Sequence, residues 1–110
     1  MVNRKGAVTE FDVEKYLEAW SQPGAINGSL EYYRTLQKDR DKYLEGWTGI
    51  INVPTLVIHG MKDPAILPQT LKNLKNYVKN LKIVYIENAS HFVMVDSPEI
   101  VIQNIREFLR

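Results

Sequence analysis

The sequence predicts an α/β fold in which two parallel strands with helices follow a purely helical region. Two short apolar runs, at 55–58 and 82–87, have the composition of strands, and a helix-like segment separates them. Two stretches with apolar side chains at helical spacing come before the first run. Because strand, helix, strand and helix follow one another after Pro54, we expect a right-handed crossover and parallel strands.

The composition excludes several classes of function. The 110 residues carry 14 basic and 13 acidic side chains, a net charge of +1 that provides no basic surface for nucleic acid. There is no cysteine, and two histidines alone cannot fill a zinc shell, so we expect neither a metal nor a cofactor. No apolar stretch approaches the ~20 residues of a membrane helix, and no signal region opens the sequence. A cytoplasmic location is therefore the default expectation.

The first half of the chain is predicted to be helical after a flexible start. Residues 1–9 are polar without periodicity and are expected to form a flexible segment. Thr9 and Asp12 have the spacing of a helix cap, and Pro23-Gly24 ends the helix that they begin. A second helix is predicted from about 28 to 37.

After a charged connection over 38–53, the pattern changes to that of an α/β unit. The run at 55–58, ended by His59-Gly60, suits a strand that is covered on both faces. Pro68 predicts the first turn of one amphipathic helix, with apolar side chains at Leu71, Leu74 and Val78. The remaining predicted elements are the strand at 82–87 and a helix opened by Ser97-Pro98-Glu99.

Asp63 and His91 follow the two predicted strands, at the edge where open parallel sheets hold their active sites. The Asp63 carboxylate could accept a hydrogen bond from one imidazole nitrogen of His91, leaving the other nitrogen as a general base. Each residue alone also suits a plainer role, because Asp63 precedes Pro64 as turn-forming residues do, and His91 suits a packed or surface loop. Other polar residues are expected to be non-catalytic: a structural His59, and solvated Asp96 and Glu87.

Several motifs occur together in one order along the chain. They are Pro54-Thr55-Leu56-Val57-Ile58-His59-Gly60-x-x-Asp63, Ala89-Ser90-His91-Phe92, Asp96-Ser97-Pro98-Glu99 and Ile105-x-x-Phe108-Leu109. As a set they resemble the C-terminal portion of α/β-hydrolases. Upstream, the stretch from Trp20 to Gly28 that runs into 30–34 is similar to the end of the cap domain in the epoxide hydrolase branch. The resemblance implies a partial α/β-hydrolase fold, with the end of a cap domain and a connection over 10–50 and the C-terminal core over 51–110.

The resemblance also implies roles for individual residues. Asp63 would be the acid of a catalytic triad, and His91 the base that activates the hydrolytic water. Tyr33 matches the cap tyrosine that donates a hydrogen bond to the epoxide oxygen, a role that suits a phenol. A tyrosine at this spacing from Leu30 is more often a packed core residue than a catalyst, and Tyr32 would take the role if the match shifts by one residue. The implied substrate is a small epoxide or ester.

The nucleophile of such a triad is not found in this sequence. It would lie on a sharp turn, as Gly-x-Asp-x-Gly or Gly-x-Ser-x-Gly, and none of the six glycines forms such a motif. We therefore expect the C-terminal part of an enzyme, inactive alone, whose open strand edge pairs with a missing N-terminal half or with a second copy. Two alternatives remain: an esterase or dehalogenase of the same fold, or a non-catalytic module that binds a partner through this edge.

Overall fold

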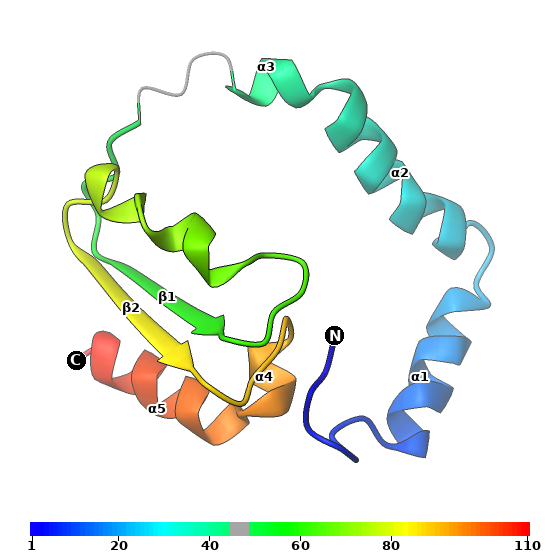
Figure 1. Ribbon diagram of the computed structural model, residues 1–110. Helices are drawn as coiled ribbons and strands as arrows, with labels where there is room; N and C mark the ends of the chain where they lie inside the picture. Colours follow the sequence, from blue (N-terminus) through cyan, green and yellow to red (C-terminus); the bar gives the residue numbers. More distant parts are fainter. Residues whose placement is uncertain (45–48) are drawn as a thin grey trace. The chain divides into compact units, whose positions relative to one another are not determined.

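The computed structural model describes residues 1–44 and 49–110, which belong to two compact units. The sheet unit comprises Met1–Ala7 and Gly49–Arg110 and contains both strands (Figure 1). The helical unit, Val8–Thr48, is described up to residue 44. Both candidate catalytic residues of the α/β region therefore lie in the sheet unit.

The two strands of the sheet unit are parallel, as predicted. Strand β1 (Thr55–Gly60) pairs with β2 (Leu81–Ile86) in a register that runs from Thr55 opposite Leu81 to Gly60 opposite Ile86. Their ends differ by one or two residues from the predicted runs. The register places the last residues of both strands side by side, so the loops that follow them leave the same edge of the sheet.

The prediction of a single amphipathic helix after Pro68 is wrong. The structure has two short 3-10 helices instead, η1 (Pro68–Leu71) and η2 (Leu74–Asn76). Asn73, between them, adopts φ −96° and ψ 0°, outside the α-helical region. Asparagine disfavours helix interiors because its side chain competes with the backbone for hydrogen bonds, so periodicity alone overestimated the helix here.

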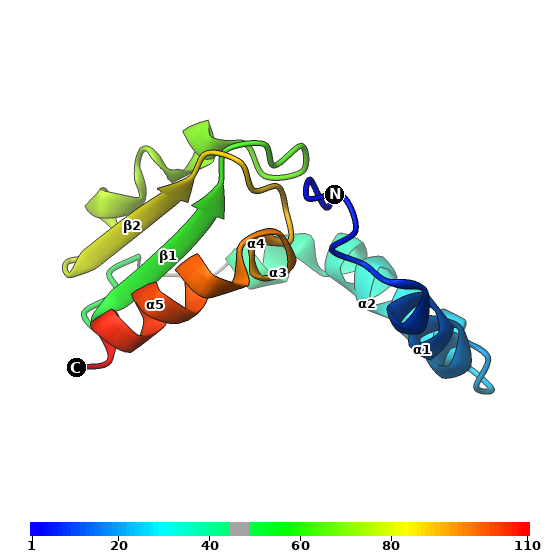
Figure 2. The same ribbon diagram turned by 90° about the horizontal axis from the view of Figure 1, so that it is seen from below.

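Two helices complete the sheet unit. The short α4 (Val93–Asp96) was not predicted, whereas α5 (Pro98–Phe108) begins with proline at its first turn as expected. Figure 2 shows α5 and the 3-10 segment on opposite sides of the two strands. The arrangement is thus a three-layered part of an α/β fold.

Few apolar side chains of the described residues are buried. Val78, Ile86 and Ala89 are almost inaccessible, while Ile102 and Ile105 of α5 remain close to half exposed. Burial of apolar surface is the main favourable contribution to the free energy of folding. Because this core is small, the conformation of the loops at the sheet edge depends on their hydrogen bonds. Those hydrogen bonds define the geometry of the candidate site.

The helical unit confirms the predicted helix start at Thr9. Helix α1 (Glu10–Trp20) has a capping box, in which the Thr9 hydroxyl accepts from the Asp12 amide at 3.2 Å and the Asp12 carboxylate accepts from the Thr9 amide at 2.8 Å. Helix α2 (Ala25–Lys38) begins three residues earlier than predicted. Its N-cap, Gly24, has φ 80°, a conformation that favours glycine.

Two further regions have more structure than predicted. The charged connection over 38–53 contains a short helix, α3 (Arg40–Leu44), and its residues 45–48 lie outside the described residues. At the start of the chain, Met1–Ala7 belongs to the sheet unit, and the Asn3 side-chain amide donates to the Asn88 carbonyl at 2.7 Å. In the described ranges, no helix has the length and apolar character needed to cross a bilayer.

Candidate functional site

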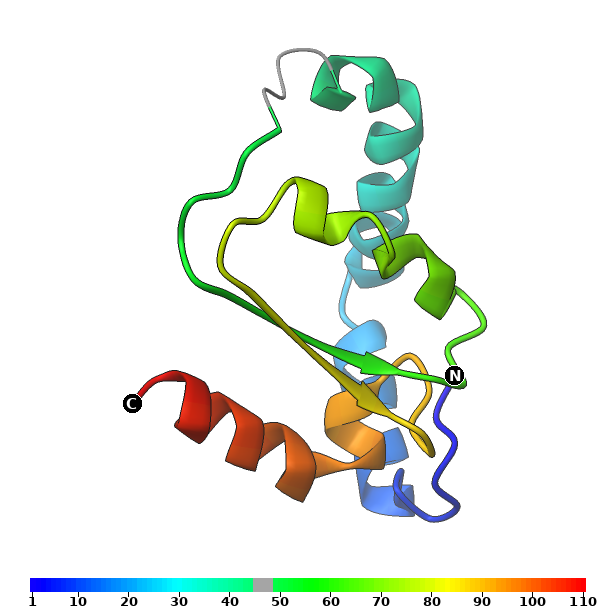
Figure 3. The same ribbon diagram turned by 60° about the vertical axis from the view of Figure 1, so that its left-hand side comes forward.

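The loops that follow β1 and β2 are joined by hydrogen bonds at one edge of the sheet. Figure 3 shows both arrows ending at this edge, with a loop after each. The Met61 amide donates to the Ile86 carbonyl at 3.0 Å, and the Lys62 amide donates to the Ala89 carbonyl at 3.0 Å. The Ser90 hydroxyl also donates to the Lys62 carbonyl at 3.2 Å. The two loops therefore hold each other in place.

Gly60, at the end of β1, permits this close approach. A Cβ atom at Gly60 would lie 2.5 Å from the Ala89 carbonyl oxygen and 2.7 Å from the Ala89 carbonyl carbon, and it would also meet the Ser90 carbonyl oxygen. Its φ is not positive, so a sharp left-handed turn is not the reason for glycine here. The position requires glycine because the backbone of the histidine loop (88–92) occupies the space of a side chain.

Asp63 and His91 are in direct contact. The Nδ1 atom of His91 lies 2.9 Å from Oδ2 of Asp63. The other carboxylate oxygen of Asp63 accepts from the backbone amides of Ala65 at 2.8 Å and Ile66 at 2.9 Å. Asp63 thus forms the turn that its position before Pro64 suggests and also orients an imidazole, so its two interpretations are compatible.

Hydrogen bonds lower the pKa of Asp63. Removal from water by itself raises the pKa of this carboxyl, but hydrogen bonds from Ile66, His91 and Ala65, together with the charge of His91, outweigh that effect and lower the pKa from 3.8 to about 2. Asp63 is therefore a carboxylate throughout the neutral range. Such a group can accept a hydrogen bond from an imidazole and stabilise its protonated form.

The lowered pKa makes folding depend on acidity. Because the pKa of Asp63 is depressed in the folded state, its contribution to stability is present above pH 4 and is lost as the pH falls through about 2. We expect the urea midpoint of the protein to fall over this range, and to fall less in Asp63→Asn. Glu87→Gln, which removes an exposed carboxylate, is the control. Identical acid profiles for Asp63→Asn and wild type would contradict the prediction.

The second nitrogen of the imidazole is available for chemistry. Within the part of the chain that the structure describes, Nε2 of His91 has no hydrogen-bond partner, and the side chain is 29% exposed. Phe92 packs against the ring edge to face, with ring centroids 5.1 Å apart. An imidazole that donates from Nδ1 to a carboxylate leaves Nε2 able to accept a proton from water or another group.

Asp96 is buried, and the expectation that it would be solvated is wrong. Its side chain lies at the end of α4, the residue is only 5% exposed, and it accepts a hydrogen bond from the Ser90 amide at 2.7 Å. The sequence Asp96-Ser97-Pro98 resembles an ordinary helix start and does not predict this burial. Two of the three amides that donate to Asp96, those of Asn3 and Arg4, lie more than 90 residues away. Glu87 is exposed, as expected. His59 is buried, its ring contacts that of Tyr85 edge to face, and its Nε2 is unpaired among the described residues.

Tyr33 lies in the helical unit, on α2. Its side chain is 68% exposed and contacts Tyr32 edge to face, with ring centroids 5.3 Å apart. Most of the surface of Tyr33 is thus exposed to solvent. The pairing of Tyr33 with the Asp63 and His91 site stays a prediction.

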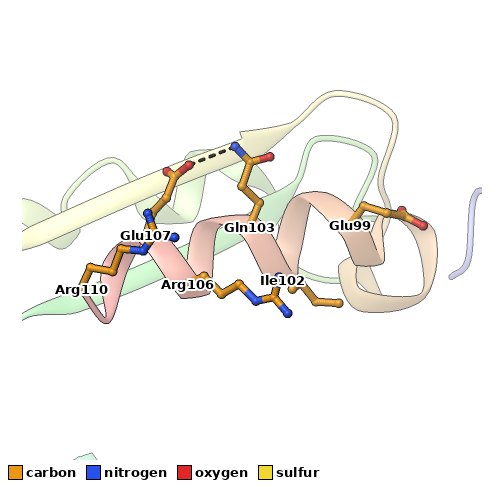
Figure 4. A pocket seen from close by; sticks show the side chains of 6 residues that line it. All are labelled: Glu99, Ile102, Gln103, Arg106, Glu107 and Arg110. Carbon is orange, nitrogen blue, oxygen red and sulfur yellow. Dashed lines mark hydrogen bonds between the residues drawn. The ribbon is translucent and has the colours of Figure 1, made fainter.

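A separate hollow of about 560 Å³ lies along one side of α5 (Figure 4). All but one of the side chains that line it are charged or amide groups, and Gln103 donates a hydrogen bond of 3.0 Å to Glu107. The lining residues are Glu99, Ile102, Gln103, Arg106, Glu107 and Arg110. It contains neither Asp63 nor His91. Across residues 1–44 and 49–110, no cluster of three potential metal ligands occurs either.

Comparison with known proteins gives a consistent result. The family described as "alpha/beta hydrolase fold" matches residues 4–98. The chain is 33% identical over 108 residues to the AB hydrolase superfamily protein YfhM of Bacillus subtilis, covering 98% of this chain and 37% of that protein. It is 32% identical over 111 residues to epoxide hydrolase 4 of Homo sapiens, covering 99% of this chain and 30% of that protein.

Solved structures show the same similarity. An epoxide hydrolase from Bacillus megaterium in complex with an inhibitor superposes with a TM-score of 0.80 at 28% identity, covering 94% of this chain and 38% of that one. Cfl2 of Burkholderia cenocepacia has a TM-score of 0.81 at 19% identity, a similarity of fold alone. The chain spans about a third of the length of these relatives.

Proposed function

The chain belongs to the alpha/beta hydrolase fold family, and we propose that Asp63 and His91 are the acid and the base of its hydrolytic site. The observation that carries this proposal is the 2.9 Å contact between His91 Nδ1 and Asp63 Oδ2 at the carboxyl edge of the two parallel strands. The carboxylate stays ionised at neutral pH and fixes the imidazole, whose Nε2 then takes a proton from water.

We propose that the complete protein adds water to an epoxide. A carboxylate nucleophile attacks an epoxide carbon, the carbon–oxygen bond breaks, and the oxygen takes a proton from the Tyr33 hydroxyl. Water then gives a proton to His91 and attacks the ester carbonyl. His91 passes this proton to the leaving alkoxide, which releases the diol, and the carboxylic acid that remains returns a proton to the Tyr33 phenolate, restoring both groups. Supporting this choice, several relatives of known sequence and structure are named epoxide hydrolases.

The nucleophile in this scheme comes from polypeptide other than these 110 residues. A nucleophile on a glycine-flanked turn has no counterpart in the sequence. Removing the nucleophile from a triad abolishes nearly all of its rate enhancement. The proposal therefore assigns this chain two of the three triad residues and no turnover in isolation.

A substrate comparison tests the reaction class. The chain, combined with the polypeptide that supplies the nucleophile, is given an aryl epoxide and, separately, an aryl ester. We expect diol formation from the epoxide to exceed ester hydrolysis, and no product from the chain alone. Preferred cleavage of the ester would instead assign an esterase-type hydrolase, and binding without any turnover would assign an interaction module.

The same assay, run on tyrosine variants, tests the role of Tyr33. We expect Tyr33→Phe to lower kcat/KM for the epoxide about 100-fold, because the developing negative charge on oxygen loses its hydrogen-bond donor. Tyr32→Phe removes the neighbouring hydroxyl from the same helix and is the matched control. A larger loss in Tyr32→Phe than in Tyr33→Phe would transfer the role to Tyr32.

A further inference from the structure

Asp96 is a buried carboxylate for which the proposed reaction has no use. Its Oδ2 atom accepts from the Ser90 amide at 2.7 Å. Its Oδ1 atom accepts from the backbone amides of Asn3 at 2.7 Å and Arg4 at 2.8 Å. Burial raises the pKa of Asp96, but these three amides and the charge of Arg4 lower it further than burial raises it, so the group is an anion.

These hydrogen bonds converge on the backbone around His91. Ser90 directly precedes His91, and its hydroxyl also reaches the Lys62 carbonyl in the loop that carries Asp63. On the other side of His91, the Phe92 amide donates to the Met1 carbonyl at 3.5 Å. The Asn3 side chain holds the Asn88 carbonyl at 2.7 Å. The histidine loop is thus tied at three points to the amino-terminal residues 1–4 and Asp96.

We propose that Asp96 is a positioning residue for His91: its carboxylate clamps the histidine loop to Asn3 and Arg4 and so keeps His91 Nδ1 at Asp63. The proposal rests on the function proposed above for the Asp63–His91 pair. The His91 side chain is partly exposed, so its direction depends on the backbone that carries it. If that backbone moves, Nδ1 loses its acceptor and the imidazole no longer presents an unprotonated Nε2.

The substitution Asp96→Asn isolates this effect. The amide has nearly the shape of the carboxylate, but its nitrogen cannot accept a hydrogen bond. Whichever way the amide is turned, either the Ser90 amide or the amides of Asn3 and Arg4 then face another donor. The clamp is weakened while the size of the side chain is retained.

The tautomer of His91 is the readout, because a purely structural role of Asp96 would not alter it. Long-range ¹H–¹⁵N NMR correlations distinguish Nδ1–H from Nε2–H in a neutral imidazole through carbon-bound protons. The protein has two histidines, and spectra of His91→Gln identify the signals of His59. We expect His91 to be in the Nδ1–H form in the wild type, and expect Asp96→Asn to lose this form in favour of Nε2–H, which free imidazole prefers.

Two further variants complete the test. Glu87→Gln makes the same chemical change at an exposed position just before the histidine loop, and we expect it to leave the His91 tautomer unchanged. Arg4→Pro removes the Arg4 amide hydrogen, one of the two donors to Asp96 Oδ1, and we expect a partial loss of the Nδ1–H form. Arg4→Pro decides the matter if Asp96→Asn does not fold, as judged by its amide spectrum.

The outcomes separate the two proposals. A folded Asp96→Asn that keeps the Nδ1–H form overturns the positioning role and leaves the Asp63–His91 pair intact. If Asp96→Asn is unfolded, an unchanged tautomer in a folded Arg4→Pro overturns it equally. A wild-type protein in which His91 is in the Nε2–H form contradicts the pair itself, and with it the proposed function.

Discussion

Replacing His91 with glutamine is expected to lower epoxide turnover by the complete protein about 10³-fold or more. Glutamine cannot take a proton from water, whereas attack of the nucleophile on the epoxide does not require the base. The ester formed with the nucleophile should therefore accumulate. Steady-state kinetics measure the loss of turnover, and mass spectrometry of the protein, mixed with substrate and quenched in acid, detects the ester as added mass.

The other histidine provides the control for this experiment. His59 is buried at the end of β1 and makes an aromatic contact with Tyr85, so we expect His59→Gln to lower stability without trapping the ester. Release of the diol by His91→Gln at the wild-type rate would remove His91 from the mechanism. Ester accumulation in both variants would show that a general loss of structure, and not the loss of the base, is responsible.

The substitution Gly60→Ala is expected to lower the free energy of unfolding by about 3 kcal/mol. The added Cβ atom would lie 2.5 Å from the Ala89 carbonyl oxygen. That oxygen belongs to the backbone and cannot move aside by changing a rotamer. Either the histidine loop shifts away from β1, which separates His91 from Asp63, or the strand pair is distorted.

Urea unfolding followed by circular dichroism measures this effect, and Gly28→Ala is the matched control. Gly28 lies inside α2, with nothing within 4 Å of the position of an added Cβ atom. Alanine there should raise stability by about 0.5–1 kcal/mol, because it favours the helix. Equal stability of Gly60→Ala and wild type would show that the loop can move away from β1 with little loss of folding free energy.

Several features followed from local sequence patterns alone. The apolar runs predicted two parallel strands, and the Thr9 and Asp12 spacing predicted the start of α1. The positions of Asp63 and His91 directly after these strands predicted a contact across 28 residues, and the structure places their side chains together. Such predictions succeed because strand order determines which loops meet at one edge of a parallel sheet.

The predictions failed at two places: where a side chain interrupts a helical pattern, and where hydrogen-bond donors come from distant parts of the chain. The segment after Pro68 has helical periodicity, yet Asn73 interrupts it and the structure forms 3-10 turns. Asp96 looks like an ordinary polar residue before a helix, yet it is buried. Nothing near Asp96 in the sequence predicts that the amides of Asn3 and Arg4, more than 90 residues away, will surround it.

Local patterns in the sequence were enough to predict the α/β class, the strand pair and the contact between Asp63 and His91, because periodicity and loop position are local properties. The hydrogen bonds and close contacts that hold this pair in place became evident from the folded structure. It showed that Gly60 is needed for the close approach of the Ala89 backbone, and that Asp96 is an anion enclosed by three amides. Both effects depend on atoms that meet only after folding, where van der Waals contact and hydrogen-bond geometry replace sequence spacing.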